Sequence, residues 1–143
     1  MIEHLRFDLS VERRQVVCSA QLEGEPIPWM RTGHGRRGQI YTPARYRDHR
    51  TALAWSMLEG RMLRAPLAVP IGLWCTFYRS SRRAVDLDNL LKAVGDAGTG
   101  IVWGDDAQIT LLLGRLEVDR ELPRTEIVAY RRELPVETVG EVP

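Results

Sequence analysis

Residues 86–108 constrain this chain more than any other stretch. They contain five of its eight aspartates and its only lysine, Lys92. Neighbouring carboxylates repel one another, so a fold that gathers them needs something that stabilises their charge. Helix caps, a surface ion pair and turn residues could account for each aspartate separately. They do not explain why so many fall in one supersecondary unit, and we therefore predict a functional site here.

The first half of the stretch has the pattern of an amphipathic helix. Apolar residues recur at helical spacing at Leu87, Leu90, Leu91 and Val94. On the opposite face Asp88, Lys92 and Asp96 stand four apart and stack in one row. Asp86 precedes the helix and can act as its N-cap. We expect the glycines at 95 and 98 to end the helix early.

The second half supplies two more carboxylates. A short turn follows the helix and leads to Asp105 and Asp106, and we expect this turn to bring both of them back towards the start of the helix. Asp105 can be a ligand or a turn residue, and the sequence leaves both open.

Carboxylate oxygens at this density suit Mg²⁺ or Mn²⁺. The three histidines and two cysteines are scattered and form no zinc spacing. An EF-hand loop is excluded, because Leu90 and Leu91 stand where that loop needs an oxygen ligand and a glycine. The pattern favours a magnesium-type site with open positions, which suits activation of water against a phosphodiester.

The motif Asp86-x-Asp88-Asn89-Leu90-x-Lys92, followed by Asp96 and by Val102-Trp103-x-Asp105-Asp106-x-Gln108-Ile109, closely resembles the signature of the RusA family of Holliday-junction resolvases. Upstream, Gly24-x-Pro26-x-Pro28-x-x-Arg31 and Tyr41-x-Pro43 are similar to other recurrent elements of the family. The resemblance covers residues 16–130.

The resemblance implies metal-binding and catalytic roles for Asp86, Asp88 and Asp106, and a catalytic role for Lys92. It implies a homodimer, of a kind often encoded by phages or prophages, that uses Mg²⁺, or Mn²⁺ in its place, to nick branched DNA symmetrically. We expect Asp96 to hold Lys92 in position rather than to bind metal. The chain departs from the family pattern at two places. Val85 stands where a basic residue often precedes the first aspartate. Trp29 and Met30 occupy the region where many relatives carry a lysine before Arg31.

Positive charge is concentrated ahead of the motif. Residues 31–50 carry six arginines against one acid, and residues 101–143 carry nine acids against five arginines. A phosphate backbone is the natural partner of the basic part. We predict a DNA-contacting flap over residues 29–40 and a basic loop after residue 79, with the candidate DNA-binding residues Arg31, Arg36, Arg37, Arg79, Arg82 and Arg83.

The remaining pattern predicts one α+β domain over residues 1–143, with a mixed sheet packed by two main helices. We expect strands over residues 16–22, 69–79, 109–118 and 125–131. The strand over 69–79 is apolar on both faces and so central, and the last two strands run antiparallel. Thr42 and Pro43 open a helix over residues 43–63. Residues 1–14 form an arm, a strand or a frayed end, and residues 133–143 a disordered tail.

No uncharged run is long enough to span a membrane, and the first residues have no signal-peptide pattern. We therefore expect a cytoplasmic protein. The function indicated is a metal-dependent endodeoxyribonuclease acting on branched double-stranded DNA. The alternatives are a branched-DNA-binding protein with a vestigial metal site, and a phosphotransfer enzyme of small substrates, which the absence of a nucleotide-cradling glycine motif disfavours.

Overall fold

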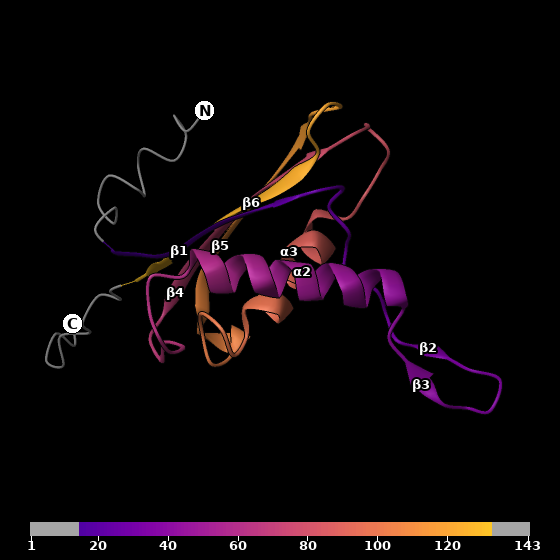
Figure 1. Cartoon of the computed structure of the whole chain (residues 1–143), viewed down its shortest axis with the longest axis horizontal. Helices are drawn as coiled ribbons and strands as arrows, with labels where there is room; N and C mark the ends of the chain where they lie inside the picture. Colours follow the sequence, from indigo (N-terminus) through magenta and orange to yellow (C-terminus); the bar gives the residue numbers. More distant parts are fainter. Residues whose placement is uncertain (1–14, 133–143) are drawn as a thin grey trace, which may run out of the picture.

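The computed structural model describes residues 15–132, so the expectations for residues 1–14 and 133–143 lie outside it. Its elements are β1 (Val16–Glu23), β2 (Gly33–His34), β3 (Ile40–Tyr41), α2 (Ala44–Gly60), β4 (Ile71–Arg79), α3 (Leu87–Gly98), the 3-10 helix η3 (Asp106–Gln108), β5 (Ile109–Val118) and β6 (Arg124–Arg131). A four-stranded mixed sheet, a small hairpin and two helices of several turns (Figure 1) confirm the predicted α+β class for the described part of the chain.

The sheet has the strand order β1-β6-β4-β5. β4 is parallel to β5 and antiparallel to β6, which confirms the central position expected of residues 69–79. β4, α3 and β5 form a βαβ unit, the usual way to connect parallel neighbours. β5 and β6 run in opposite directions as expected, but β4 lies between them. The turn near Pro123 is therefore not a hairpin between paired strands.

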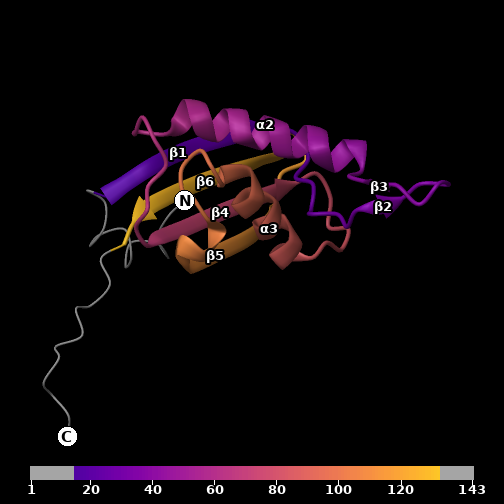
Figure 2. The ribbon, with the colours of Figure 1, turned by 90° about the horizontal axis from the view of Figure 1, so that it is seen from below.

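Both helices pack on one face of the sheet. Alternate residues of β4 (Ile71, Leu73, Cys75 and Phe77) are buried in a core with Leu53 and Met57 of α2 and Leu90 and Val94 of α3. Figure 2 shows α2 along the β1 side of the sheet and α3 on the side of β4 and β5. On the other face Trp74, Thr76 and Tyr78 are only half-buried.

Helix α2 begins one residue later and ends earlier than predicted. Pro43 occupies the N-cap position and no side chain caps the helix, so the expected cap by Thr42 is wrong. The helix ends at Gly60, where an added Cβ would lie 2.2 Å from the backbone oxygen of Ser19. Only glycine allows the helix this close to β1. Met62, which lies inside the predicted helix range, follows the observed end of the helix and is exposed.

Residues 29–40, predicted as a DNA-contacting flap, contain most of a two-stranded hairpin. Gly33 pairs with Tyr41 and His34 with Ile40. In Figures 1 and 2 this hairpin projects away from the sheet beyond the start of α2. Within residues 15–132, no helix is both long and apolar enough to cross a membrane.

Candidate functional site

Helix α3 carries the first part of the predicted site. It is anchored by its apolar face, where Leu90, Ala93, Val94 and Ala97 are buried. The opposite face leaves Asp88 and Lys92 exposed, one turn apart. Asp86 occupies the N-cap position, but its carboxylate accepts a hydrogen bond from the side chain of Asn89 at 3.4 Å and caps no backbone donor. Asp88 accepts from the backbone N–H of the same Asn89 at 3.0 Å. Asn89 thus links the two carboxylates.

The glycines expected to shorten α3 do not, because the helix continues through Gly95 to Gly98. A Cβ at Gly98 would lie 2.3 Å from the Trp103 ring and 2.7 Å from Met57. The buried indole of Trp103 therefore packs directly on the helix backbone. This packing holds the turn after α3 against the end of the helix.

Lys92 lies over an aromatic ring. Its ammonium nitrogen is 3.7 Å from the centroid of Trp29, a favourable cation–π geometry. The backbone N–H of Trp29 also donates to the carbonyl of Asn89 at 2.8 Å. Trp29 is not among the predicted site residues, and in the sequence it is recognisable only as a departure from the family pattern. The available signal was its position two residues before the recurrent Arg31.

The segment that carries Trp29 is held at a second point. The backbone N–H of Ile27 donates to Nε2 of His49 on α2 at 3.4 Å. Burial, and then the charge of Arg45, lower the pKa of His49 to about 4. The imidazole is therefore neutral at physiological pH and can accept this bond. Residues 27–29 thus connect α2 and α3 just before the projecting hairpin begins.

Asp96 has a different partner from the one we expected. Its carboxylate accepts a hydrogen bond from the Tyr46 hydroxyl on α2 at 2.9 Å. Burial, and then this hydrogen bond, raise the pKa of Tyr46 to about 12. The ion pairs found within residues 15–132 do not include one between Lys92 and Asp96. Asp96 joins the two helices, whereas Trp29 contacts Lys92.

Asp105 and Asp106 lie at the start of η3. Asp105 caps this short helix by accepting from the Ala107 N–H at 2.9 Å, and the Gln108 side chain accepts from the Asp105 N–H at 2.8 Å. Gln108 also donates to the carbonyls of Leu67 and Val69, which fixes η3 to the preceding loop. Asp105 is therefore a capping residue in this structure.

The two adjacent carboxylates are electrostatically unequal. A hydrogen bond with Asp105, followed by slight desolvation of this exposed side chain and by the charges of Asp105 and Asp96, raises the pKa of Asp106. The Ala107 N–H and then the hydrogen bond with Asp106 lower the pKa of Asp105. The pair therefore has one carboxyl that binds a proton more readily than its neighbour.

Asp106 lies beside the second half of α3 rather than its start. The charge of Asp96 acts on it, and an added Cβ at Gly95 would be 3.9 Å from Ile109, which directly follows η3. Asp96 is eight residues beyond Asp88, roughly 12 Å along a helix axis. The tight turn of residues 99–104, with Gly100 N–H bonded to the Trp103 carbonyl, keeps the chain at this end. The expected gathering of Asp86, Asp88 and Asp106 around one point is not observed in the described part of the chain.

Asp86 and Asp88 thus lie at the start of α3, and Asp106 lies near Asp96. Among residues 15–132, no three Asp, Glu, His or Cys side chains are gathered closely enough to hold a metal ion. Asp86 and Asp88 nevertheless suit a hard divalent cation by donor chemistry. Both are exposed, and neither has an ion-pair partner in the described part of the chain. Mg²⁺ is commonly bound by one or two carboxylates together with substrate phosphates, so this pair fits such an ion.

The predicted basic loop leads directly from β4 to Asp86. Arg82 and Arg83 are exposed on it. Arg79 is mostly buried, pairs with Glu25 at 3.4 Å and donates to the Arg83 carbonyl. Arg79 therefore shapes the loop, whereas Arg82 and Arg83 are free to contact a ligand.

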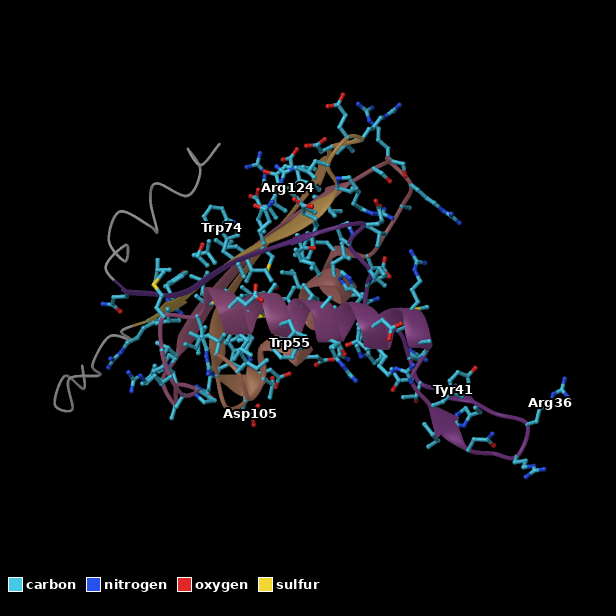
Figure 3. All side chains as sticks on the ribbon, viewed as in Figure 1. Arg36, Tyr41, Trp55, Trp74, Asp105 and Arg124 are labelled. Carbon is cyan, nitrogen blue, oxygen red and sulfur yellow. The ribbon has the colours of Figure 1, made fainter. Side chains whose placement is uncertain are left out.

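The other three predicted DNA-binding arginines lie on and beside the hairpin. Arg31, Arg36 and Arg37 are all exposed. Figure 3 shows Arg36 at the tip of the hairpin, far from Asp105, and Tyr41 near its base. The hairpin is therefore a basic arm that extends from the segment holding Trp29.

Comparison with known proteins gives one consistent result. The family model described as endodeoxyribonuclease RusA matches residues 23–129, a range that includes every predicted site residue. The crossover junction endodeoxyribonuclease rusA of Enterobacteria phage 82 is 34% identical over 88 residues, which are 58% of this chain and 72% of that protein. The crossover junction endodeoxyribonucleases RusA of Escherichia coli strain K12 and of Escherichia coli O1:K1 / APEC are each 33% identical over 88 residues, again 58% of this chain and 72% of the relative.

Proposed function

This chain belongs to the RusA family of endodeoxyribonucleases, and we propose that it is a metal-dependent enzyme that nicks branched double-stranded DNA. The observation that carries the proposal is the exposed face of α3. There Asp86, Asp88 and Lys92 lie within two helical turns, directly after a loop with two exposed arginines. Carboxylates, an ammonium group and guanidinium groups are together what phosphodiester hydrolysis requires.

Asp86 and Asp88 are the residues that would hold Mg²⁺, or Mn²⁺ in its place, with Asp106 as the third predicted ligand. RusA-family proteins are generally metal-dependent nucleases, which supports this assignment. The bound ion would supply Lewis-acid polarisation of the scissile phosphate and a water of lowered pKa. Asn89 orients the first two carboxylates, since it contacts both.

Lys92 would donate to a phosphate oxygen as negative charge develops during cleavage. Its exposed ammonium is on the same face of α3 as Asp88, and Trp29 limits the positions it can take. A compact ammonium with three donors suits this place better than a planar guanidinium. Cleavage would leave a 5′-phosphate and a 3′-hydroxyl, ends that can be ligated.

DNA binding is assigned to two basic surfaces. Arg82 and Arg83 would contact phosphates next to the cut, and Arg31, Arg36 and Arg37 of the arm would contact the backbone further away. The arm is a two-stranded ribbon, an element that DNA grooves can admit. Paired cuts in a four-way junction with two-fold symmetry require two such sites, which is why we also propose a homodimer acting on DNA in the cytoplasm.

The test is cleavage of a panel of synthetic DNAs with identical sequence but different branching: linear duplex, flap, fork and four-way junction. Each is incubated with Mg²⁺, with Mn²⁺ and with EDTA. We expect cleavage of one or more branched forms in the presence of either ion, none in EDTA, and little cleavage of linear duplex. Binding of branched DNA with no cleavage under any condition would instead identify the protein as a binding protein with a vestigial metal site.

A further inference from the structure

Trp55 on α2 is the most exposed of the four tryptophans, with 61% of its surface accessible to solvent. The other three are half-buried or buried. Figure 3 shows Trp55 on α2, away from the hairpin that carries Arg36. One exposed apolar side chain needs no explanation by itself. The surroundings of Trp55 therefore decide whether it has a function.

Trp55 lines a groove between α2 and α3. The groove has a volume of about 380 Å³, within the range of about 300–1,000 Å³ that is usual for sites that hold small ligands. Apolar side chains from both helices line it together with four polar ones: Ala54, Leu58, Ala97 and Ile101, and Arg50, Thr51, Asp96 and Thr99. The groove leaves room for a planar ring against the indole.

The groove adjoins the proposed active site along α3. Asp88, Lys92 and Asp96 follow one another at intervals of four residues, and Asp96 lines the groove. Along the helix axis Asp96 is about 6 Å from Lys92 and about 12 Å from Asp88. Stacked bases of one DNA strand are about 3.4 Å apart. A strand with a phosphate at Lys92 therefore has bases within a few nucleotides of the groove.

Basic side chains connect the groove with the arm. Arg45 and Arg47 are exposed in the first turns of α2, which follows the arm, and Arg50 lines the groove. The Arg50 guanidinium is 5.4 Å from the centroid of the Tyr46 ring and belongs to none of the ion pairs found in residues 15–132. It can therefore contact a phosphate.

An aromatic surface beside a guanidinium group matches the two parts of a nucleotide, its base and its phosphate. We propose that the groove binds an unpaired nucleobase of branched DNA, stacked on Trp55, while Arg50 contacts a neighbouring phosphate. The proposal rests on the nuclease function proposed above. It names a residue through which the enzyme would prefer branched to linear DNA.

The preference follows from the cost of exposing a base. In a linear duplex each base is paired and stacked, and moving it onto a protein side chain costs unpairing and unstacking free energy. Bases in the single-stranded arms of a fork or flap are already unpaired. Stacking on Trp55 should therefore strengthen binding of these forms and leave binding of linear duplex unchanged.

The test measures affinity in EDTA, so that binding is separated from cleavage. The DNAs are a fork with single-stranded arms, the same fork with abasic nucleotides in those arms, and a linear duplex. Stacking of a base on an aromatic side chain changes affinity by roughly 5- to 150-fold. We expect wild type to bind the intact fork more tightly than the abasic fork by a factor in this range. Trp55→Ala should lose that factor and bind the abasic fork and the duplex as wild type does.

Three further variants separate stacking from other effects. Trp55→Phe retains an aromatic face and should keep part of the preference for the intact fork. Trp55→Leu is apolar but has no ring, and should behave as Trp55→Ala. Leu122→Ala changes an exposed apolar residue (41%) between β5 and β6, outside the groove, and should bind all three DNAs as wild type does. Thermal unfolding confirms that each variant is folded.

Equal affinity of wild type for the intact and abasic forks overturns the proposal, and this comparison needs no variant. An equal loss by Trp55→Ala on all three DNAs also overturns it. So does a change in sedimentation on replacing Trp55, which would show that a second copy of the chain covers the indole. A wild type that prefers the intact fork through Trp55 but cuts no branched DNA with Mg²⁺ or Mn²⁺ would support the groove and contradict the nuclease function. A protein that binds no DNA contradicts both.

Discussion

The ammonium of Lys92 lies 3.7 Å from the centre of the Trp29 ring. Lys92 is the only lysine of the chain, and Trp29 belongs to a segment tied to α3 by the bond from its own N–H to Asn89. That segment continues into the basic arm. The position of the proposed catalytic ammonium is therefore linked through Trp29 to the part of the molecule that we expect to contact DNA.

Replacing Trp29 should affect catalysis through Lys92. A cation–π contact contributes about 0.5–2 kcal/mol, so Trp29→Leu should lower kcat by roughly 2- to 30-fold. Trp29→Phe, which retains an aromatic face, should recover part of that loss. The measurement is kcat and KM on a cleavable junction, with thermal unfolding to confirm the fold. In a Lys92→Met background, Trp29→Leu and Trp29→Phe should have the same kcat. A difference in kcat that persists there would show that Trp29 acts through packing and not through Lys92.

Asp88→Asn should abolish cleavage while leaving junction binding intact or tighter, because it removes a metal ligand and a negative charge. The loss should exceed the roughly 100-fold typical of residues that only orient a ligand. Cleavage rates and gel-shift affinities measure the two effects. Asp119→Asn, at the β5–β6 turn and paired with Arg124, is the matched control and should cut at nearly the wild-type rate. Normal cutting by Asp88→Asn would remove Asp88 from the metal assignment.

Reversing Arg36 and Arg37 to Glu should weaken junction binding and reduce its dependence on salt. Each phosphate contact contributes about 0.9 to the slope of log K against log salt concentration, so the slope should fall by up to about 1.8. Affinities at four or more salt concentrations provide the measurement. Arg64→Glu changes an exposed arginine outside the arm and should leave the slope unchanged. Equal slopes for the arm variant and wild type would show that the arm does not bind phosphate.

Asp105→Asn should move the acid limb of the pH–rate profile to lower pH. The hydrogen bond with Asp105 is the largest cause of the raised pKa of Asp106, and an amide can donate to the Asp106 carboxylate and favour its charged form. If cleavage needs ionised Asp106, wild-type activity falls as pH drops through that raised pKa, and the variant stays active further into acid. Asn preserves the cap of η3. An acid limb at the wild-type position would exclude Asp106 as the titrating group.

Gly98→Ala and Gly95→Ala should change stability in opposite directions. Alanine favours a helix over glycine by about 1 kcal/mol, and at Gly95 the nearest atom to an added Cβ is 3.9 Å away. At Gly98 the same Cβ would overlap Trp103, and overpacking of this kind costs about 1–3 kcal/mol. Urea unfolding should give a higher midpoint for Gly95→Ala than for Gly98→Ala. Equal midpoints would mean that Trp103 moves aside at little cost.

Local patterns in the sequence were enough to predict much of the fold. Alternation located the strands, and apolar residues on both faces of residues 69–79 predicted the central place that β4 has between β6 and β5, although one of its faces is only half-buried. The apolar repeat of Leu87, Leu90, Leu91 and Val94 located α3 and fixed Asp88 and Lys92 on its open face. These inferences succeeded because the periodicity of one element determines which of its own side chains are buried.

Contacts between elements depend on packing that local periodicity does not encode. The turn after α3 stays at the end of that helix because Trp103 packs on Gly98. Asp106 lies near Asp96 and, in the described part of the chain, forms no metal-holding cluster with Asp86 and Asp88. Packing between distant segments also determines that Lys92 contacts Trp29 and that Asp96 accepts a hydrogen bond from Tyr46. The sequence alone predicted which residues carry the proposed chemistry, and its helical repeat placed Asp88 and Lys92 on the exposed face of α3. Only the tertiary structure determined which of these side chains contact one another, because such contacts depend on how segments distant in the sequence pack together.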